Sequence, residues 1–347
     1  MLIKSELIPG RTYIDKITLY RYNPDMKLFL SNADYLRNFE SFLRRFDGEQ
    51  TDRLEIATHS KWVNVHPVIL TMIAAISRTV SADRITIDEI TAKSGHYLDR
   101  MGLFKILGKD SPYAITEHES AGRFIPLTQI RTQEEQSKFI TDMIPLLHLC
   151  PEQSDAIKYT VGELVRNVLE HSNAVNGAFV AAQYYPSQNV VRLGICDAGI
   201  GIRQSISRSW QTQSDIEAIR LALLPGITGT TKREGGTESN AGAGLFFIKS
   251  MAMVARDYFV LYSGNGLYKL LKRDKRTKGF PRLHADPGQD RHAETNSAPY
   301  FHGTLVGIDI SLDQTVEFTA LLSVIRDAYT RALKERKKER YKKPRFT

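Results

Sequence analysis

The sequence predicts an α/β protein made of a small and a larger α/β part. Short runs rich in β-branched residues alternate with apolar helical segments, and the polar stretch 108–122, rich in turn formers, separates the two sets. A chain of 347 residues has room for about two domains. We therefore expect a small domain over residues 1–115, a larger one over 116–333 and a basic tail over 334–347.

The composition is that of an ordinary globular protein, with 42% hydrophobic and 25% charged residues. The only two cysteines, Cys150 and Cys196, lie in apolar surroundings, and we expect both to be buried small hydrophobic side chains rather than a redox pair. No signal peptide is apparent at the N-terminus, and the most apolar run, 65–80, is too short and too polar to span a membrane. These features favour a cytoplasmic protein without a membrane span.

The net charge of +8 comes from two basic segments. Residues 334–345 hold eight basic and two acidic side chains, and residues 269–282 hold seven basic side chains and one acidic. The remainder of the chain is therefore mildly acidic. Such segments can bind nucleic acid, anionic lipid or an acidic partner, and a solvated helix end and a flexible loop explain them equally well.

In the small part, residues 54–58 and 84–87 read as strands. Residues 67–76 have the apolar density of a buried helix that begins at a proline, and residues 97–107 read as a helix broken at Gly102. These elements predict a small α/β layer fold.

The larger part continues the alternation. A hairpin turn is expected at 186–189, residues 225–241 read as a mobile loop, and 273–299 read as an insertion or flexible connection. Strands are predicted over 124–130, 177–185, 190–197, 258–263, 267–271 and 304–311, and helices over 133–149, 152–171, 214–224, 244–254 and 316–333.

The first chemical motif is the spacing of Glu163, Asn167 and His171, four residues apart, which places all three on one face of a helix. The Asn167 side-chain oxygen suits Mg²⁺ held beside phosphates. The Glu163 carboxylate can orient or deprotonate an attacking nucleophile. Taken alone, such a stripe is more often a solvated helix face.

The second motif is Asp197, which ends an apolar strand and is followed by Gly199 and Gly201. A carboxylate there can accept a hydrogen bond from an exocyclic amine such as that of adenine. The glycines allow a ligand to approach the backbone closely, although an ordinary turn has the same composition.

The third motif, Gly242, Gly244 and Leu245, precedes a predicted helix. Backbone N–H groups at such a helix start can receive phosphate oxygens. A simple Gly-rich turn is the alternative for this fragment alone.

In this order and with these gaps, the three motifs resemble the GHKL superfamily of gyrase-type, chaperone, histidine-kinase and mismatch-repair ATPases, over about residues 124–312. The resemblance implies an α/β sandwich with helices on one face of a mixed sheet, the Bergerat-type ATP fold. It also implies ATP and Mg²⁺ as cofactors, and dimerisation in many members.

By match to the family's motifs, Asn167 is expected to bind Mg²⁺ and Glu163 to be the base or the water-orienting residue. His171 completes that motif. Asp197 is expected to read adenine, with Gly199 and Gly201 forming the floor of its pocket.

The third motif places Gly242 and Gly244 at the phosphates, and Thr304 resembles the family's late Gly-Thr strand beside the adenine. The loop 225–241 corresponds to the ATP lid, and Thr231 is its candidate phosphate contact. The chain departs from the pattern at Asn240, where the family often has another glycine; asparagine tolerates left-handed backbone, so binding is expected to persist.

Residues 50–110 resemble a STAS domain, the fold of anti-sigma-factor antagonists. The resemblance rests on Trp62–Pro67 and on the helix that ends at Met101-Gly-Leu-Phe. Regulated members carry a phosphorylatable serine where Val65 and His66 stand here, so the resemblance implies that the phosphoserine switch is absent.

No Walker A sequence and no dinucleotide-binding glycine motif occurs, and no phosphoacceptor histidine on a dimerisation helix is apparent upstream. We favour a nucleotide-driven regulatory switch with slow ATP hydrolysis, in which nucleotide changes how the N-terminal domain or a protein partner is held. One alternative is a protein-serine kinase of the anti-sigma-factor type that acts on a separate partner. Another is a non-catalytic nucleotide-binding protein whose basic tail contacts nucleic acid.

Overall fold

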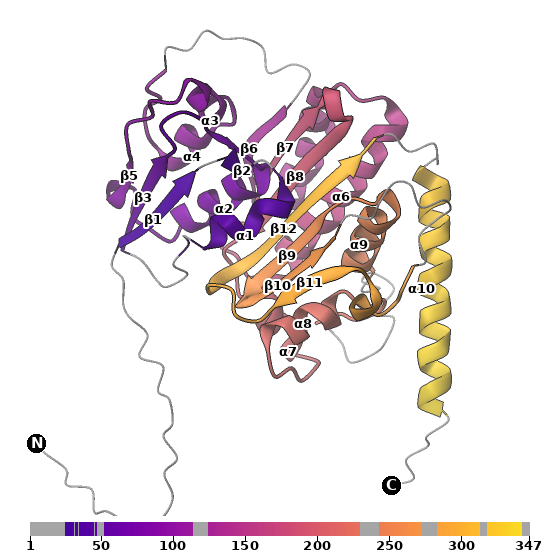
Figure 1. Ribbon diagram of the computed structural model, residues 1–347. Coiled ribbons are helices and arrows are strands. Elements are labelled where there is room, and N and C mark those ends of the chain that lie inside the picture. The colour runs from indigo at the N-terminus through magenta and orange to yellow at the C-terminus, as the bar shows by residue number, and fades with distance from the viewer. Residues whose placement is uncertain are drawn as a thin grey trace, which may run out of the picture.

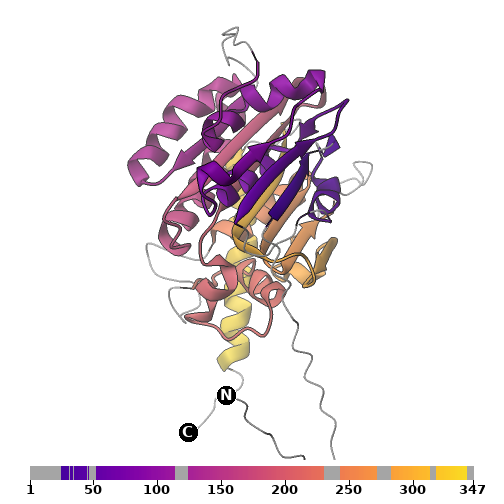
Figure 2. The same ribbon diagram turned by 90° about the vertical axis from the view of Figure 1, so that its left-hand side faces the viewer.

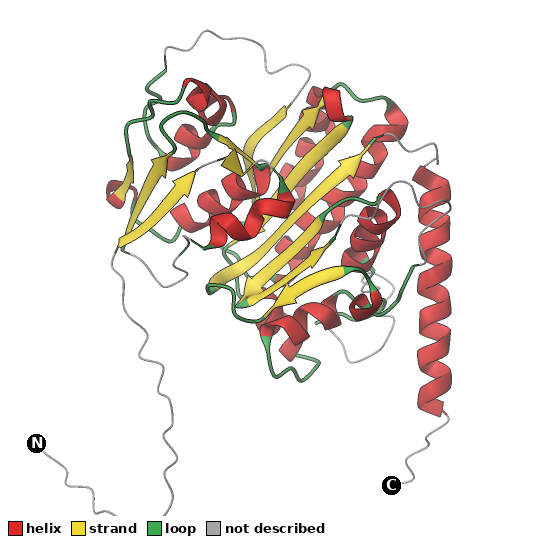
Figure 3. Cartoon of the chain, viewed as in Figure 1, coloured by secondary structure: helices red, strands yellow, loops and turns green. Residues whose placement is uncertain are grey.

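The computed structural model describes residues 25–30, 32–33, 35–44, 46, 52–113, 124–229, 243–271, 283–312 and 318–341. These residues form a mixed α/β protein, as the sequence predicts. Figures 1 and 3 show one large sheet with helices packed against it.

The large sheet has seven strands in the order β11-β10-β9-β12-β8-β7-β6. Every pair of neighbours is antiparallel, so the prediction of a mixed sheet is wrong. The physical reason lies in the connections: β7 joins β8, and β9 joins β10, by tight turns that reverse the chain. The strands are β6 Phe124–Ile130, β7 Ala178–Tyr185, β8 Val190–Asp197, β9 Phe259–Gly264, β10 Gly266–Leu270, β11 His292–Thr295 and β12 Phe301–Ser311.

Four helices cover one face of this sheet: α6 Pro151–His171, α7 Gly201–Ser207, α8 Asp215–Ala222 and α9 Gly244–Ala255. Their apolar residues join those of the strands in one continuous core. The sequence predicts three of these helices but not α7, which is only two turns long.

The opposite face of the sheet is covered by the N-terminal part, so the helices are not confined to one face. Helix α2 (Pro67–Ser77) contacts β7, β8 and β12, and all its side chains are buried. Gly194 of β8 and Gly307 of β12 pair across the sheet beneath it. A Cβ on Gly194 would lie 2.3 Å from the Cα of Val68, so α2 rests directly on the sheet backbone. Figures 1 and 2 show these indigo elements gathered against the sheet.

The start of α2 is fixed by His66. Its Nδ1 accepts a hydrogen bond from the Val68 N–H at 3.1 Å, and its Nε2 lies 3.1 Å from Asp309 Oδ1 of β12. Because Nδ1 is an acceptor, the neutral ring carries its proton on Nε2 and donates it to Asp309. His66 therefore caps a helix of the N-terminal part and ties it to the large sheet.

The N-terminal part also contains a parallel three-stranded sheet, in the order β1-β3-β5. The predicted strands and the broken helix are confirmed, and Gly102 at the break has φ 75°. Buried apolar residues of this part and of the large sheet pack together in one hydrophobic core. The elements are β1 Asp25–Leu30, β2 Asn32–Ala33, α1 Phe39–Leu43, β3 Arg53–Thr58, β4 Asn64–Val65, β5 Ile85–Ile87, α3 His96–Arg100 and α4 Leu103–Leu107.

The single helix predicted over 133–149 is divided. Helix α5 (Gln133–Lys138) passes into a π turn at Phe139–Met143 and a 3₁₀ turn at Ile144–Leu147. Proline 145 cannot donate the backbone hydrogen bond that a regular helix needs there. Cys150, just beyond, is exposed and only Cys196 is buried, so the expectation of two buried cysteines is half wrong.

The segment predicted as a flexible insertion, 273–299, contributes a sheet edge. Among its described residues, 283–299, strand β11 pairs with β10. Asp290 is fully buried in an ion pair with Lys249 of α9. This pairing between distant parts of the chain has no local sequence signal.

The final helix, α10 (Phe318–Tyr341), runs into the segment predicted as a tail from residue 334. Its first half packs on α9 and α6 through Leu321 and Ile325. Its C-terminal end reaches beyond the sheet and α8 (Figures 1 and 2). None of the helices in the described parts of the chain has both the length and the apolar character to cross a bilayer.

Candidate functional site

A cavity of about 290 Å³ lies between the sheet and its covering helices. It brings together residues from all three sequence motifs. Apolar side chains from β8, β12 and α7 form much of its wall, with polar groups at its two ends, which is the usual character of a small-molecule site. The predicted site residues that line it are Glu163, Asn167, His171, Asp197, Gly201, Gly244, Leu245 and Thr304.

Helix α6 supplies one side of the cavity, as its spacing predicts. The opposite face of α6, with Val161 and Val165, is buried in the core, and this burial fixes the rotation of the helix. His171 is largely buried, and burial lowers the pKa of its imidazole, so this end of the α6 stripe is neutral at pH 7.

Glu163 is held by Arg166, one turn further along α6. An Arg166 guanidinium N–H donates to Glu163 Oε1. The Glu163 side chain is 17% exposed and that of Arg166 is 45% exposed. Arg166 also lines the cavity, which the sequence motif does not reveal because this position lies outside the four-residue spacing.

The N-terminus of α9 faces Glu163. A Cβ on Gly244 would lie 2.7 Å from Glu163 Oε2, so any larger residue here would push the Glu163 carboxylate from its position. Ala243, which precedes the helix, provides no side-chain cap. The first residues of this twelve-residue helix line the cavity, and no side chain at the cap accepts from their N–H groups. An anion site at a helix N-terminus requires such uncapped N–H groups.

Asp197 lies where β8 ends, beside the C-terminus of α6, because its Oδ1 and the Ser172 carbonyl oxygen both lie next to Gly199. Glu163 is more than two helical turns back along α6, so the two carboxyl groups lie at opposite ends of the cavity. Asp197 is 1% exposed and lies opposite Thr304 of β12 in the strand register. Its Oδ1 accepts a hydrogen bond from the Gly199 N–H at 2.8 Å. Burial raises the pKa of this carboxyl to about 7, and the backbone N–H groups of Gly199 and Thr304 oppose that rise. A buried carboxyl with spare acceptor capacity is suited to a ligand that donates N–H groups.

The two glycines after Asp197 have different surroundings. A Cβ on Gly199 would lie 2.2 Å from the Ser172 carbonyl oxygen, and this glycine packs on the end of α6 instead of lining the cavity. Gly201 has φ 75° and lines the cavity, with Ser263 Oγ 2.8 Å from where its Cβ would be. Both glycines therefore serve the close packing of the loop.

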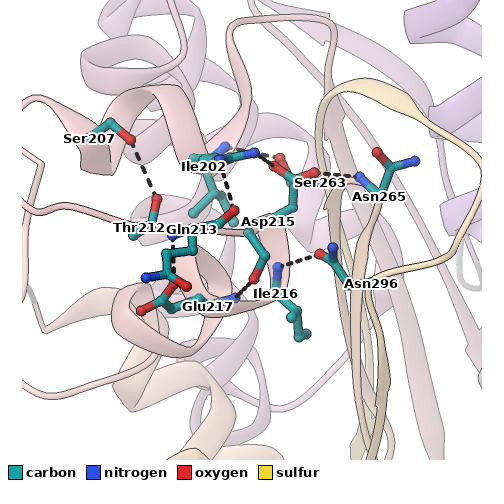
Figure 4. Close-up of polar contacts among 12 residues, drawn as sticks. Ile202, Ser207, Thr212, Gln213, Asp215, Ile216, Glu217, Ser263, Asn265 and Asn296 are labelled. Carbon is teal, nitrogen blue, oxygen red and sulfur yellow. Dashed lines mark hydrogen bonds and ion pairs between the residues drawn. The ribbon is translucent and has the colours of Figure 1, made fainter. Parts of the chain in front are cut away.

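Helices α7 and α8 are anchored to β9, to the β9–β10 turn and to Asn296, which follows β11, by polar contacts that Figure 4 shows. Ser263 Oγ accepts the Ile202 N–H at 2.9 Å and donates to the Gly303 carbonyl at 2.7 Å. Asp215 Oδ2 accepts the Asn265 N–H at 2.9 Å, and Asn296 Oδ1 accepts the Ile216 N–H at 3.0 Å. These contacts fix the side of the cavity that α7 provides.

The loop that follows α8 is described as far as Gly229, and its last residues line the cavity beside α7. Trp210 Nε1 donates to the Thr228 carbonyl at 3.0 Å, and Ser209 Oγ donates to the Gly229 carbonyl at 2.9 Å. No motif in the sequence predicts these contacts of Trp210 and Ser209. Two predicted phosphate contacts, Thr231 and Gly242, lie outside the described residues.

The described side chains do not form a complete metal site by themselves. Within the described ranges, no group of three or more His, Cys, Asp or Glu side chains could hold a metal ion. The cavity instead offers one neutral oxygen ligand on α6, Asn167. A site of this kind leaves the other ligands of Mg²⁺ to water and substrate phosphates.

Comparison of the sequence with protein-family models and with curated proteins finds no match.

Proposed function

We propose that the protein binds ATP with Mg²⁺ and acts as a regulatory switch with slow ATP hydrolysis, as a GHKL-type domain joined to a STAS-like part. The observation that carries the proposal is that one cavity joins a buried carboxyl, Asp197, to an uncapped helix N-terminus at Gly244. The first suits the amine of adenine and the second suits phosphates.

The α6 residues suit the chemistry at the phosphate end. Asn167 would hold Mg²⁺, which neutralises phosphate charge when it is bound. Glu163 would orient a water molecule and accept its proton. Arg166 pairs with Glu163, so the carboxylate is held in place on the cavity wall.

Strands β8 and β12 offer a route from the nucleotide to the N-terminal part. They carry Asp197 and Thr304 at one end of the cavity. Three residues along each strand, Gly194 and Gly307 contact α2 on the opposite face. Movement of these strands on nucleotide binding would reach α2 directly.

The second candidate is a protein-serine kinase that acts on a separate partner. Arg166 leaves Glu163 partly exposed at the cavity wall, where a hydroxyl of another chain could take the place of water. Labelled ATP with candidate partners separates the two reactions, because a kinase transfers the label to protein and an ATPase releases it as phosphate.

The test of the main proposal is a pair of variants measured by calorimetry and by phosphate release. Asp197→Asn should abolish ATP binding, because the amide cannot accept as the carboxylate does and places an N–H donor against the adenine amine. Glu163→Ala should keep ATP binding within about threefold and lower turnover by about 100-fold. Equal ATP affinity in the wild type and Asp197→Asn would remove the pocket assignment.

The basic residues 334–345 are a proposed contact for nucleic acid. In the described part of this segment, Lys334 and Lys338 are exposed, and α10 carries them beyond the region that packs on α9. Lys334→Glu with Lys338→Glu should weaken duplex binding and lower its salt dependence. Lys61→Glu with Lys93→Glu, exposed in the N-terminal part, is the matched control. A protein partner and a homodimer are further proposals, which co-purification and light scattering would test.

A further inference from the structure

Arg166 is the only lysine or arginine among the described residues that line the cavity. A triphosphate brings several negative charges to the end of the cavity where Glu163 is already placed. The α9 N-terminus and Mg²⁺ can offset part of that charge. A cationic side chain on the wall is the further element that such a ligand requires.

The guanidinium has room to make a second contact. Its hydrogen bond to Glu163 uses one nitrogen, Nη2, as the donor. Among the described residues, its other N–H groups meet no hydrogen-bond acceptor, and the side chain is 45% exposed. A planar guanidinium has five donors and can bind two anionic groups at once.

The position of Arg166 places it at the phosphate end and not at the adenine end. It follows Glu163 by one helical turn, and the other Glu163 oxygen lies against Gly244 at the start of α9. Asp197, at the opposite end, has no contact with it among the described residues. A ligand whose base reaches Asp197 therefore brings its last phosphate toward Arg166.

We propose that Arg166 forms the subsite for the terminal phosphate of a nucleoside triphosphate, with one edge of the guanidinium on Glu163 and the other on that phosphate. The inference rests on the proposed nucleotide function. It adds a specificity: the site distinguishes triphosphate from diphosphate through this side chain. The same contact holds Glu163 beside the terminal phosphate.

The test is calorimetric titration of the full chain with ADP and with a non-hydrolysable ATP analogue, both with Mg²⁺. The wild type should prefer the triphosphate. Arg166→Gln should weaken triphosphate binding by about tenfold, the loss of one half-exposed charge-assisted hydrogen bond, and change ADP affinity by less than about twofold. Arg166→Lys should recover part of the preference, since it keeps the charge but not the fork.

The matched control is Arg208→Gln, which removes the same charge from an exposed position outside the cavity lining. It should leave both affinities unchanged. Equal losses for ADP and triphosphate in Arg166→Gln, or no loss for either, would overturn the subsite. A wild-type chain that binds neither nucleotide would instead refute the proposed function, and unchanged circular dichroism separates both results from misfolding.

Discussion

Replacing Asp197 by asparagine should remove a large pH dependence from the free energy of unfolding. Burial raises the pKa of this carboxyl from 3.8 to about 7. Because the folded-state pKa lies above the unfolded value, the folded protein binds more protons than the unfolded chain between these two values. Stability therefore falls as pH rises across this window, and below it the penalty is absent.

The magnitude follows from the size of the shift. A pKa difference of about 3 corresponds to about 4 kcal/mol of unfolding free energy at about pH 8 and above, since each pKa unit is worth about 1.4 kcal/mol. Asparagine carries no charge, and its oxygen can still accept the Gly199 N–H. The stability of Asp197→Asn relative to the wild type should thus rise by up to about 4 kcal/mol between about pH 4 and pH 8.

Urea unfolding followed by circular dichroism at several pH values measures this difference. Asp83→Asn is the matched control, because Asp83 is fully exposed and its pKa is lowered mainly by the Ser81 hydroxyl. Because the folded-state pKa of Asp83 is lowered, the stability of Asp83→Asn relative to the wild type should not rise as pH increases. A constant stability difference between wild type and Asp197→Asn across the whole pH range would refute the reasoning.

The same carboxyl gives a test of how the nucleotide binds. An adenine amine that donates to Asp197 favours the carboxylate and lowers its pKa. Near pH 7, the pKa of about 7 means that binding releases part of a proton. Calorimetry in buffers of different ionisation enthalpy measures that release. Tight binding without proton release would place the base away from Asp197.

Two other predictions concern the core, and urea unfolding measures both. Gly194→Ala should cost at least about 2 kcal/mol, because its Cβ would lie 2.3 Å from the Val68 Cα. Gly162→Ala, with no neighbour closer than 3.9 Å, should stabilise by about 0.5–1 kcal/mol; a similar effect at both positions would contradict the packing. Lys249→Met should cost about 3–5 kcal/mol by leaving buried Asp290 unpaired, and adding Asp290→Asn should recover most of that loss; no recovery would show that the pair is not the cause.

The sequence identifies those parts of the site that depend on local geometry. Helical spacing alone places Glu163, Asn167 and His171 on one side of the cavity, since the period of the helix fixes the face. The end of an apolar strand likewise predicts where the Asp197 carboxyl lies. These assignments need no knowledge of distant contacts.

Other parts depend on contacts that the sequence does not encode locally. The proposed role of Arg166 depends on a side-chain pair with Glu163 outside the motif spacing, and Gly199 packs against Ser172, which is distant in sequence. The sequence predicts a flexible segment where β11 lies because the residues there are polar, whereas pairing with β10 makes them an edge strand. Tertiary context overrides local preference in such cases.

The contact between α2 and the sheet has a consequence for the proposed switch. A side-chain interface can absorb small shifts by rotamer changes, but Gly194 meets the backbone of Val68 directly, and packed backbones transmit displacement. Nucleotide binding at Asp197, three residues further along β8, should therefore change hydrogen exchange of the α2 amides. The amides of β5, at the far edge of the small sheet, serve as the control. Unchanged exchange in α2 at saturating nucleotide would mean that this helix is a fixed cover for the sheet and that the switch acts through another surface.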